Sequence, residues 1–230
     1  MGITGLERPI LAVDVVVFRM ADGGLEVLMH ERDKAPFEGA ISLPGTAVRV
    51  DETLMEAARR ALTEKVGIPA DASGDGTIYL DQLATFDALF RDPRGRTVSV
   101  AYLGLTRPDE PAFNAGFWRS VFGITGGTLP FDHHQILDAA VTRLAGKLRY
   151  TNIAQGFLPE TFRIDALQAV YEAVLQRRLN RTNFRNKLLK IGLIERASVL
   201  NEAVGEKGGR PPHLYRFTGG LIEAVDRDFL

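Results

Sequence analysis

The 230-residue chain has 45% hydrophobic and 25% charged residues, which is an ordinary composition for a globular protein. Its 28 basic and 29 acidic residues nearly cancel, so the total charge gives no reason to expect a polyanionic partner. The chain contains no cysteine, which excludes disulfides, a thiolate nucleophile and any cysteine-based zinc or iron–sulfur site. The length suits one large domain or two small ones.

The first elements predicted along the chain are two strands joined by a tight turn. Residues 10–19 form a β-branched run, and residues 25–31 alternate between apolar and polar side chains. The Asp-Gly-Gly sequence at residues 22–24 predicts a hairpin turn between them. The apolar run at residues 10–18 is short and contains Asp14, which argues against a signal peptide or a membrane span. We therefore expect a cytoplasmic protein without a membrane partner.

A helix and further strands are predicted in the next hundred residues. Asp51, Glu52 and Thr53 supply N-terminal caps and acidic charge, and an apolar stripe at helical spacing then continues as far as Gly67. Strands are predicted over residues 78–86, 97–105 and 113–122, and a second helix over residues 134–148. The apolar stripe of the first helix consists of Leu54, Ala57, Ala58, Ala61, Leu62 and Val66.

The C-terminal third differs from the rest in charge and in pattern. Residues 1–155 hold 16 basic and 20 acidic side chains, a net charge of −4, whereas residues 156–230 hold 12 basic and 9 acidic, a net charge of +3. Helices are predicted between residues 164 and 191, followed by two strands at residues 193–200 and 214–217 around a loop rich in glycine and proline. Helices followed by a β-ribbon are typical of a winged helix. We therefore expect two domains, residues 1–150 and 151–230.

Residues 46–68 resemble the Nudix box, the pattern G-x5-E-x7-R-E-U-x-E-E-x-G-U in which U is a bulky aliphatic residue. The residues that match the pattern are Glu52, Arg60, Leu62, Glu64, Gly67 and Ile68. The resemblance implies an α+β fold, a Nudix-like α/β/α sandwich with a mixed sheet, whose helix holds Mg²⁺ or Mn²⁺ against a diphosphate. Three positions depart from the pattern, because Thr46 replaces the glycine while Ala61 and Lys65 replace carboxylates. We expect no hydrolase activity, no metal ligand and no required cofactor; the alternative is an ordinary amphipathic helix with a solvated charged face.

A Nudix scaffold that lacks these carboxylates can still bind a nucleoside diphosphate, because the lost negative charge favours an anionic ligand. Arginine makes fork-shaped contacts to phosphate, so arginines near this helix are the first candidates. An exposed hairpin tip of mixed charge is an equal alternative for the run at residues 91–96. His133 and His134 are interpreted as the start of a helix rather than as metal ligands. The candidate ligand-binding residues are Arg32, Gly45, Arg60, Glu64, Arg91, Arg94 and Arg96.

Residues 177–190 contain six basic side chains and no acidic one. Such a local field favours nucleic acid whatever the total charge. On a helix, Phe184, Leu188 and Ile191 share one face, and the opposite polar face suits base reading in the major groove of DNA. The glycine- and proline-rich loop adds Lys207 and Arg210 as a basic wing for the DNA backbone and minor groove. The alternatives are a solvated helix face, RNA or a protein partner. The candidate DNA-binding residues are Arg181, Thr182, Asn183, Arg185, Asn186, Lys187, Lys190, Lys207 and Arg210.

Both parts together resemble the NrtR family, Nudix-related transcriptional regulators of NAD metabolism, over essentially the whole chain. Besides the Nudix box, the resemblance rests on segments 79–83, 91–102, 131–133, 147–151, 158–162 and 183–188. It implies a homodimeric repressor of genes for NAD synthesis or salvage, which binds palindromic double-stranded operator DNA. It also implies an effector, ADP-ribose or a related NAD-derived nucleotide, that releases the DNA.

Two other functions remain open on the same residues. The first is a Nudix hydrolase of ADP-ribose-type nucleoside diphosphates, in which Glu64 would hold the metal with help from Glu52 or Glu56. The second is a regulator of sugar catabolism, which shares the DNA-binding half and differs in its effector.

Overall fold

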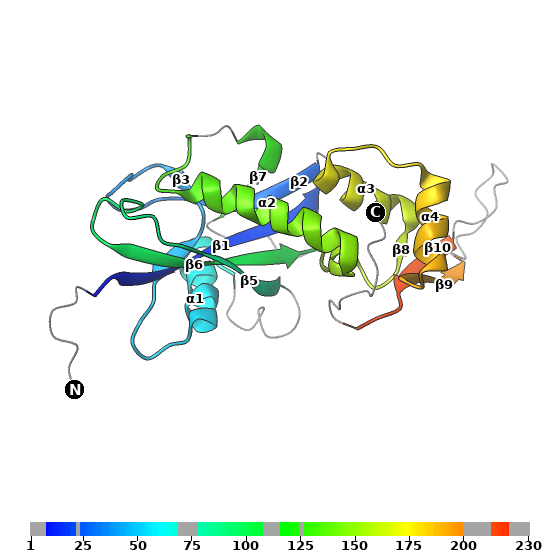
Figure 1. Cartoon of the computed structure of the whole chain (residues 1–230), viewed down its shortest axis with the longest axis horizontal. Helices are drawn as coiled ribbons and strands as arrows, with labels where there is room; N and C mark the ends of the chain where they lie inside the picture. The colour runs from blue at the N-terminus through cyan, green and yellow to red at the C-terminus, as the bar shows by residue number, and fades with distance from the viewer. Residues whose placement is uncertain are drawn as a thin grey trace. The chain divides into compact units, whose positions relative to one another are not determined.

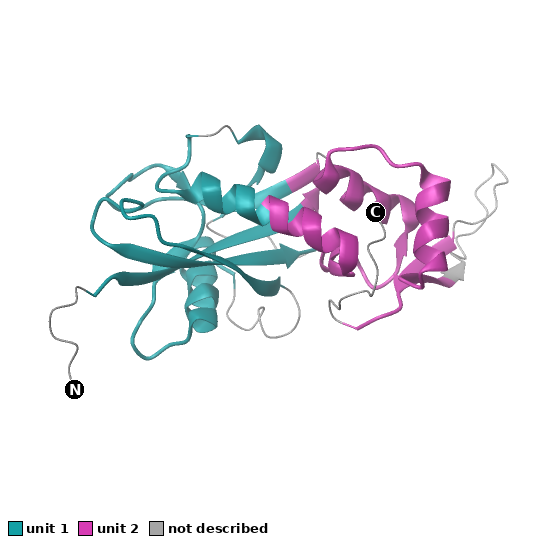
Figure 2. Cartoon of the chain, viewed as in Figure 1, with its two compact units in different colours: residues 1–19, 26–140 teal, residues 20–25, 141–230 magenta. Residues whose placement is uncertain are grey.

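The computed structural model describes residues 8–21, 24–68, 78–107, 116–124, 127–199 and 213–220 (Figure 1). The chain divides into two compact units, unit 1 with residues 1–19 and 26–140 and unit 2 with residues 20–25 and 141–230 (Figure 2). One division falls inside helix α2 (His133–Tyr150), and the predicted domain border at residue 150 lies at the end of that helix. Within the described ranges, no helix is both long enough and apolar enough to cross a lipid bilayer.

A mixed sheet of seven strands forms the centre of unit 1, as the Nudix resemblance implied. Its strands are β1 (Ile10–Ala21), β2 (Gly24–Glu31), β3 (Ile41–Ser42), β4 (Gly45–Ala47), β5 (Ile78–Phe86), β6 (Thr97–Thr106) and β7 (Phe117–Ser120). The main order is β3-β2-β1-β6-β5, with β4 paired to β1 and β7 paired to β2. Only the central pair, β1 and β6, is parallel; the other described pairs are antiparallel.

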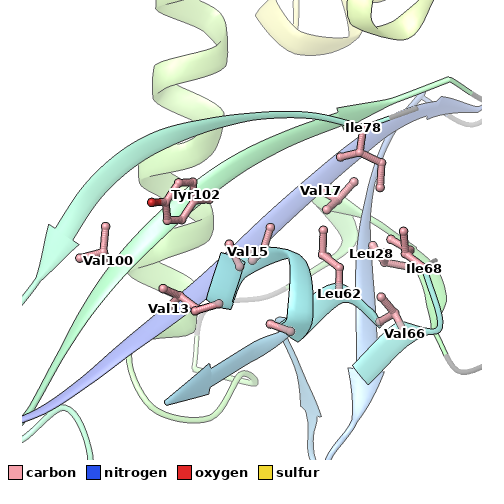
Figure 3. Close-up of a cluster of buried hydrophobic side chains, with 13 residues drawn as sticks. Val13, Val15, Val17, Leu28, Leu62, Val66, Ile68, Ile78, Val100 and Tyr102 are labelled. Atoms are coloured by element: carbon pink, nitrogen blue, oxygen red, sulfur yellow. The ribbon is translucent and has the colours of Figure 1, made fainter. Parts of the chain in front are cut away.

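Helix α1 (Leu54–Val66) covers one face of this sheet because alternate strand residues point toward it. Val13, Val15 and Val17 of β1 are completely buried in one cluster with Leu62 and Val66 of the helix (Figure 3). Figure 1 shows the beginning of α2 on the opposite face of the sheet. The predicted apolar stripe and the predicted sandwich are therefore confirmed.

The ends of α1 are formed by the residues that predict them. Thr53 accepts a hydrogen bond from the amide of Glu56 at 3.2 Å, and the Glu56 carboxylate accepts one from the amide of Thr53 at 2.7 Å. This reciprocal pair is a capping box, and it satisfies two amide groups that the first turn leaves open. Gly67 ends the helix in the left-handed region with φ 76°.

Unit 2 contains the predicted winged helix, with one strand more than expected. Its elements after α2 are η3 (Ile153–Phe157), β8 (Phe162–Arg163), α3 (Ile164–Leu175), α4 (Arg181–Lys190), β9 (Ile194–Val199) and β10 (His213–Phe217). The three strands form a sheet in the order β8-β10-β9. The sequence predicted only the β9–β10 ribbon, because a strand of two residues is too short to show alternation.

The two helices of the winged helix meet through an aromatic contact. The rings of Tyr171 in α3 and Phe184 in α4 lie edge to face, with centroids 5.0 Å apart. Both residues are buried, together with Leu188 one turn further along α4. This packing determines which face of α4 is left to solvent.

Candidate functional site

A pocket of about 320 Å³ opens in unit 1, at the edges of β1 and β4 and near the first residue of α2. Five basic and three acidic side chains line it, so its charge favours an anionic ligand. The volume is in the range of small-molecule sites. The charged lining residues are Asp14, Arg32, Asp33, Lys34, Lys65, Arg91, Asp92 and Arg94.

The floor of the pocket is a buried cluster of ion pairs around Arg91. Its guanidinium donates to both carboxylate oxygens of Asp132, at 2.6 and 2.8 Å, and to Asp14 at 3.2 Å. Ser99 donates a further hydrogen bond to Asp14 at 2.6 Å. The Arg91 side chain is only 4% exposed. Arg91 therefore lines the pocket as predicted, but its charge is already neutralised by the protein's own carboxylates.

His133 joins this cluster at the start of α2, where the sequence predicted only a helix start. The backbone amide of Leu43 donates to Nδ1 of His133 at 3.2 Å, and the hydroxyl oxygen of Ser42 lies 3.2 Å from the same nitrogen. Because an amide N–H can only donate, Nδ1 acts as the acceptor and Nε2 carries the proton. Nε2 lies 3.5 Å from Asp14. The ring thus links β1, the loop after β3 and α2.

The environment of Asp14 keeps its carboxylate ionised. Burial by itself raises the pKa of Asp14, but the interaction with His133, the hydroxyl of Ser99 and the charge of Arg91 outweigh burial and lower the pKa to about 2. The folded-state pKa therefore lies below the value of about 3.9 for an unfolded chain. Ionised Asp14 stabilises the fold above about pH 4, and this contribution is lost as the pH falls through about 2.

We predict that Asp14→Asn changes the acid dependence of stability. The difference in unfolding free energy between wild type and variant should shrink by about 2 kcal/mol as the pH falls from about 5 to about 2. Urea unfolding of both proteins across this pH range measures that difference. A difference that stays constant over the range would show that the Asp14 pKa is not lowered in the folded state.

Two arginines and an aromatic ring, all exposed or half-buried, form one part of the pocket lining, which we call its mouth. The guanidinium carbon of Arg32 lies 4.8 Å from the ring centre of Phe131, and that of Arg94 lies 5.7 Å from it. Arg94 also pairs with Asp92 at 2.7 Å. Burial and the nearby charge of Arg94 lower the pKa of Arg32. Two positive charges held this close would both gain from an anion at the mouth.

Three predicted ligand-binding residues, Arg60, Glu64 and Arg96, do not line this pocket. Arg60 binds Glu52 at 2.6 Å and Glu64 at 3.1 Å, and it donates to the carbonyl of Ala47 at 2.8 Å. Arg96 donates to backbone carbonyls of the turn after β5, at 2.7 and 3.3 Å. These contacts tie both guanidiniums to other segments of the chain.

The carboxylates of α1 and its N-terminus do not fit a divalent-metal site. Glu52 accepts hydrogen bonds from Arg60 and from the amide of Arg49, which lower its pKa to about 2. Glu56 is used in the capping box, and Glu64 pairs with Arg60 and Arg49. Over the residues the structure describes, no three His, Asp or Glu side chains are grouped as a metal site would require.

The two positions at which the chain lacks a carboxylate of the Nudix pattern have different surroundings. Ala61 is completely buried in the core between α1 and the sheet, where the apolar cluster leaves no place for a charge. Lys65 lines the pocket, and its ammonium lies 3.4 Å from Asp33.

Helix α4 exposes most of the residues predicted to bind DNA. Asn180 caps its first turn by accepting a hydrogen bond from the amide of Asn183 at 3.0 Å. Arg185 is half-buried, and its guanidinium donates to the side chain of Asn186 at 3.0 Å. Arg181 pairs with Asp165 of α3 at 2.8 Å. The exposed candidates on this helix are Arg181, Thr182, Asn183, Asn186, Lys187 and Lys190.

Comparison with known proteins identifies both parts of the chain. Residues 8–120 match the NUDIX domain, and residues 155–217 match the NrtR DNA-binding winged helix domain. The ADPR-responsive transcriptional repressor of Acinetobacter baylyi is 32% identical over 216 residues, which cover 91% of this chain and 82% of that protein. The chain belongs to the NrtR family.

Solved structures agree with membership in the NrtR family. The crystal structure of Shewanella oneidensis NrtR complexed with a 27mer DNA is 29% identical, covers 90% of this chain and 93% of that chain, and gives a TM-score of 0.72.

The Nudix part alone also resembles an enzyme. The ADP-ribose pyrophosphatase of Methanocaldococcus jannaschii is 27% identical over 136 residues, covering 56% of this chain and 72% of that protein.

In this NrtR-family chain, the structure brings only part of the predicted ligand-binding set together. Arg32, Gly45, Arg91 and Arg94 line the pocket. The predicted wing residues Lys207 and Arg210 lie outside the described residues. Sequence reasoning missed several pocket residues, because they come from separate segments that only the fold brings close. The missed residues with polar or aromatic side chains include Asp14, His30, Asp33, Lys34, Lys65, Asp92, Phe131 and His133.

Proposed function

We propose that this NrtR-family protein is a repressor that binds palindromic operator DNA as a homodimer and leaves it when ADP-ribose, or a related NAD-derived nucleotide, occupies the pocket of unit 1. The observation that carries this proposal is the solvent-exposed polar face of α4 on a winged helix. The Acinetobacter relative supports the choice of effector, since it is an ADPR-responsive repressor. Genes of NAD synthesis or salvage are the regulated set we propose.

The DNA-binding half of the proposal follows from the side chains of α4. With Phe184 and Leu188 buried, the helix presents arginine, asparagine and lysine to solvent. Arginine pairs with guanine and asparagine with adenine in the major groove, which an α-helix fits. We assign Arg185 and Asn186 to base edges, with Thr182 and Asn183 beside them. Arg181, Lys187, Lys190 and the wing residues Lys207 and Arg210 are assigned to phosphates and the minor groove.

The effector-binding half follows from the charge of the pocket. Arg32 and Arg94 stand at its mouth beside Phe131, in position for a phosphate group. Gly45 lets β4 pass close to β1 in the pocket lining. A Cβ at this position would collide with the Asp14 carboxylate and come within 2.9 Å of the Val13 carbonyl. We propose that no hydrolysis accompanies binding, since the carboxylates of α1 are bound to other groups of the chain.

An electrophoretic mobility assay tests the proposal with the full-length protein and a pool of genomic fragments. We expect selective retention of fragments that contain a palindrome, and loss of retention when ADP-ribose is added. Retention without sequence preference would rule out a sequence-specific repressor. Selective retention that ADP-ribose and related nucleotides leave unchanged would rule out these nucleotides as effectors. A thermal-shift screen with nucleotides and sugar phosphates would then distinguish a regulator of NAD metabolism from a regulator of sugar catabolism.

A second candidate function is hydrolysis of an ADP-ribose-type nucleoside diphosphate. The observation in its favour is the NUDIX domain match over residues 8–120. It predicts release of AMP that depends on Mg²⁺ and is abolished by Glu64→Gln. We expect no such release from the wild-type protein, and release that Glu64→Gln abolishes would establish the hydrolase instead.

A further inference from the structure

Helix α1 reaches the pocket through a positive charge. Its carboxylates are held by Arg60, by Arg49 and by the capping box, whereas Lys65 in its last turn lines the pocket wall. The metal-dependent arrangement that the Nudix fold implies therefore does not fit the donors present. What the helix offers a ligand in the pocket is an ammonium group.

The pocket's cations differ in how firmly carboxylates of the chain already hold them. Arg91 and Arg94 pair with carboxylates at 2.6 and 2.7 Å. The contact of Lys65 with Asp33 is longer, at 3.4 Å, and the Asp33 side chain is 63% exposed. An exposed ion pair of that length is weak, so Lys65 can exchange Asp33 for a more highly charged anion at little cost.

Several cations surround Lys65 and make this part of the pocket positive. Their effect is seen at His30, which also lines the pocket: burial and the charges of Lys65 and Arg32 lower its pKa. Arg32, Lys34 and Arg94 line the same pocket from two other segments of the chain. A ligand that enters there meets cations from α1, from the loop after β2 and from the loop before β6.

We infer that the ammonium of Lys65 binds the diphosphate of the nucleotide effector directly, so that effector binding needs no divalent metal ion. The nature of the ligand rests on the function proposed above, whereas the anion site rests on the pocket itself. An ammonium has three donors and acts on phosphate as a point charge, which is the role that a divalent cation would otherwise take. Lys65 is thus a binding residue of the sensor pocket.

Isothermal titration of the full-length protein with ADP-ribose, in EDTA and in Mg²⁺, tests this inference. The wild-type dissociation constants in the two buffers should agree within about twofold, and Lys65→Gln should raise both by about tenfold or more. Thr63→Glu is the matched control, because it makes the same change in charge at an exposed position of α1 outside the pocket lining. It should leave both constants within about twofold.

The other outcomes separate this inference from the proposed function. Wild-type binding that weakens about tenfold or more in EDTA would overturn the inference, as would unchanged binding by Lys65→Gln. Inorganic pyrophosphate serves as a second ligand. If ADP-ribose does not bind, but pyrophosphate binds and Lys65→Gln weakens pyrophosphate binding, the proposed effector is wrong and the proposed anion site is supported. If neither ligand binds, both the inference and the effector are wrong.

Discussion

Replacing Arg91 with methionine should lower the free energy of unfolding by about 3–5 kcal/mol. The guanidinium holds Asp14 and Asp132 together at the floor of the pocket, and all three side chains are at most 10% exposed. Methionine fills similar space but leaves two buried carboxylates without a positive partner. Urea unfolding followed by circular dichroism gives the change in stability.

Two further variants separate lost packing from unpaired charge. Arg49→Met removes an ion pair with Glu64 in which both side chains are exposed, by 59% and 44%, so it should cost less than about 1 kcal/mol. Adding Asp14→Asn and Asp132→Asn to the Arg91 variant should recover part of the lost stability, because no buried charge is then left alone. An Arg91→Met protein as stable as wild type would show that the buried cluster is not what holds the pocket floor.

The double substitution Arg185→Ala and Asn186→Ala should weaken operator binding at least about thirtyfold, or by about 2 kcal/mol or more. Each side chain is assigned one base contact of about 1–3 kcal/mol, and the two are joined by a 3.0 Å hydrogen bond, so their effects need not add. Fluorescence anisotropy with a labelled operator measures the change. The loss should be much smaller on unrelated DNA, since base contacts carry the specificity.

Arg119→Ala is the control for this pair. Arg119 is an exposed arginine of β7 in unit 1, so its loss changes the total charge without touching α4. It should leave operator affinity within about twofold, and ADP-ribose affinity should be unchanged in both variants. Equal losses of operator binding in the control and in the α4 variant would point to total charge rather than to base reading.

The elements that the sequence predicts best are those in which several local signals agree. A capping residue at Thr53, an apolar stripe and a terminal glycine at Gly67 mark α1, and the structure begins and ends the helix beside these two residues. The basic run at residues 177–190 likewise predicts α4, although the helix begins only at Arg181. Gln176 takes a left-handed conformation at the end of α3, so Arg177 and Arg178 lie between the helices.

Local sequence patterns could not predict the pocket, because its residues come together only through tertiary contacts. Asp14 stands among valines in an otherwise apolar run, and its partners Arg91, Ser99 and His133 come from distant segments of the chain. Tertiary contacts also decide the role of Arg60. The sequence predicts that it binds a phosphate, whereas in the structure it is paired with Glu52. The short strands β3, β4 and β8 give no periodicity, since they contain two or three residues each.

The central claim is that a nucleotide in unit 1 and DNA on unit 2 oppose each other's binding, and a reciprocal titration tests it most directly. Operator affinity is measured by anisotropy with and without saturating ADP-ribose, and ADP-ribose affinity is measured by calorimetry with and without saturating operator. Linkage requires the two factors to be equal, and we expect both to be about fivefold or more. Operator affinity that is unchanged at saturating ADP-ribose would contradict the account.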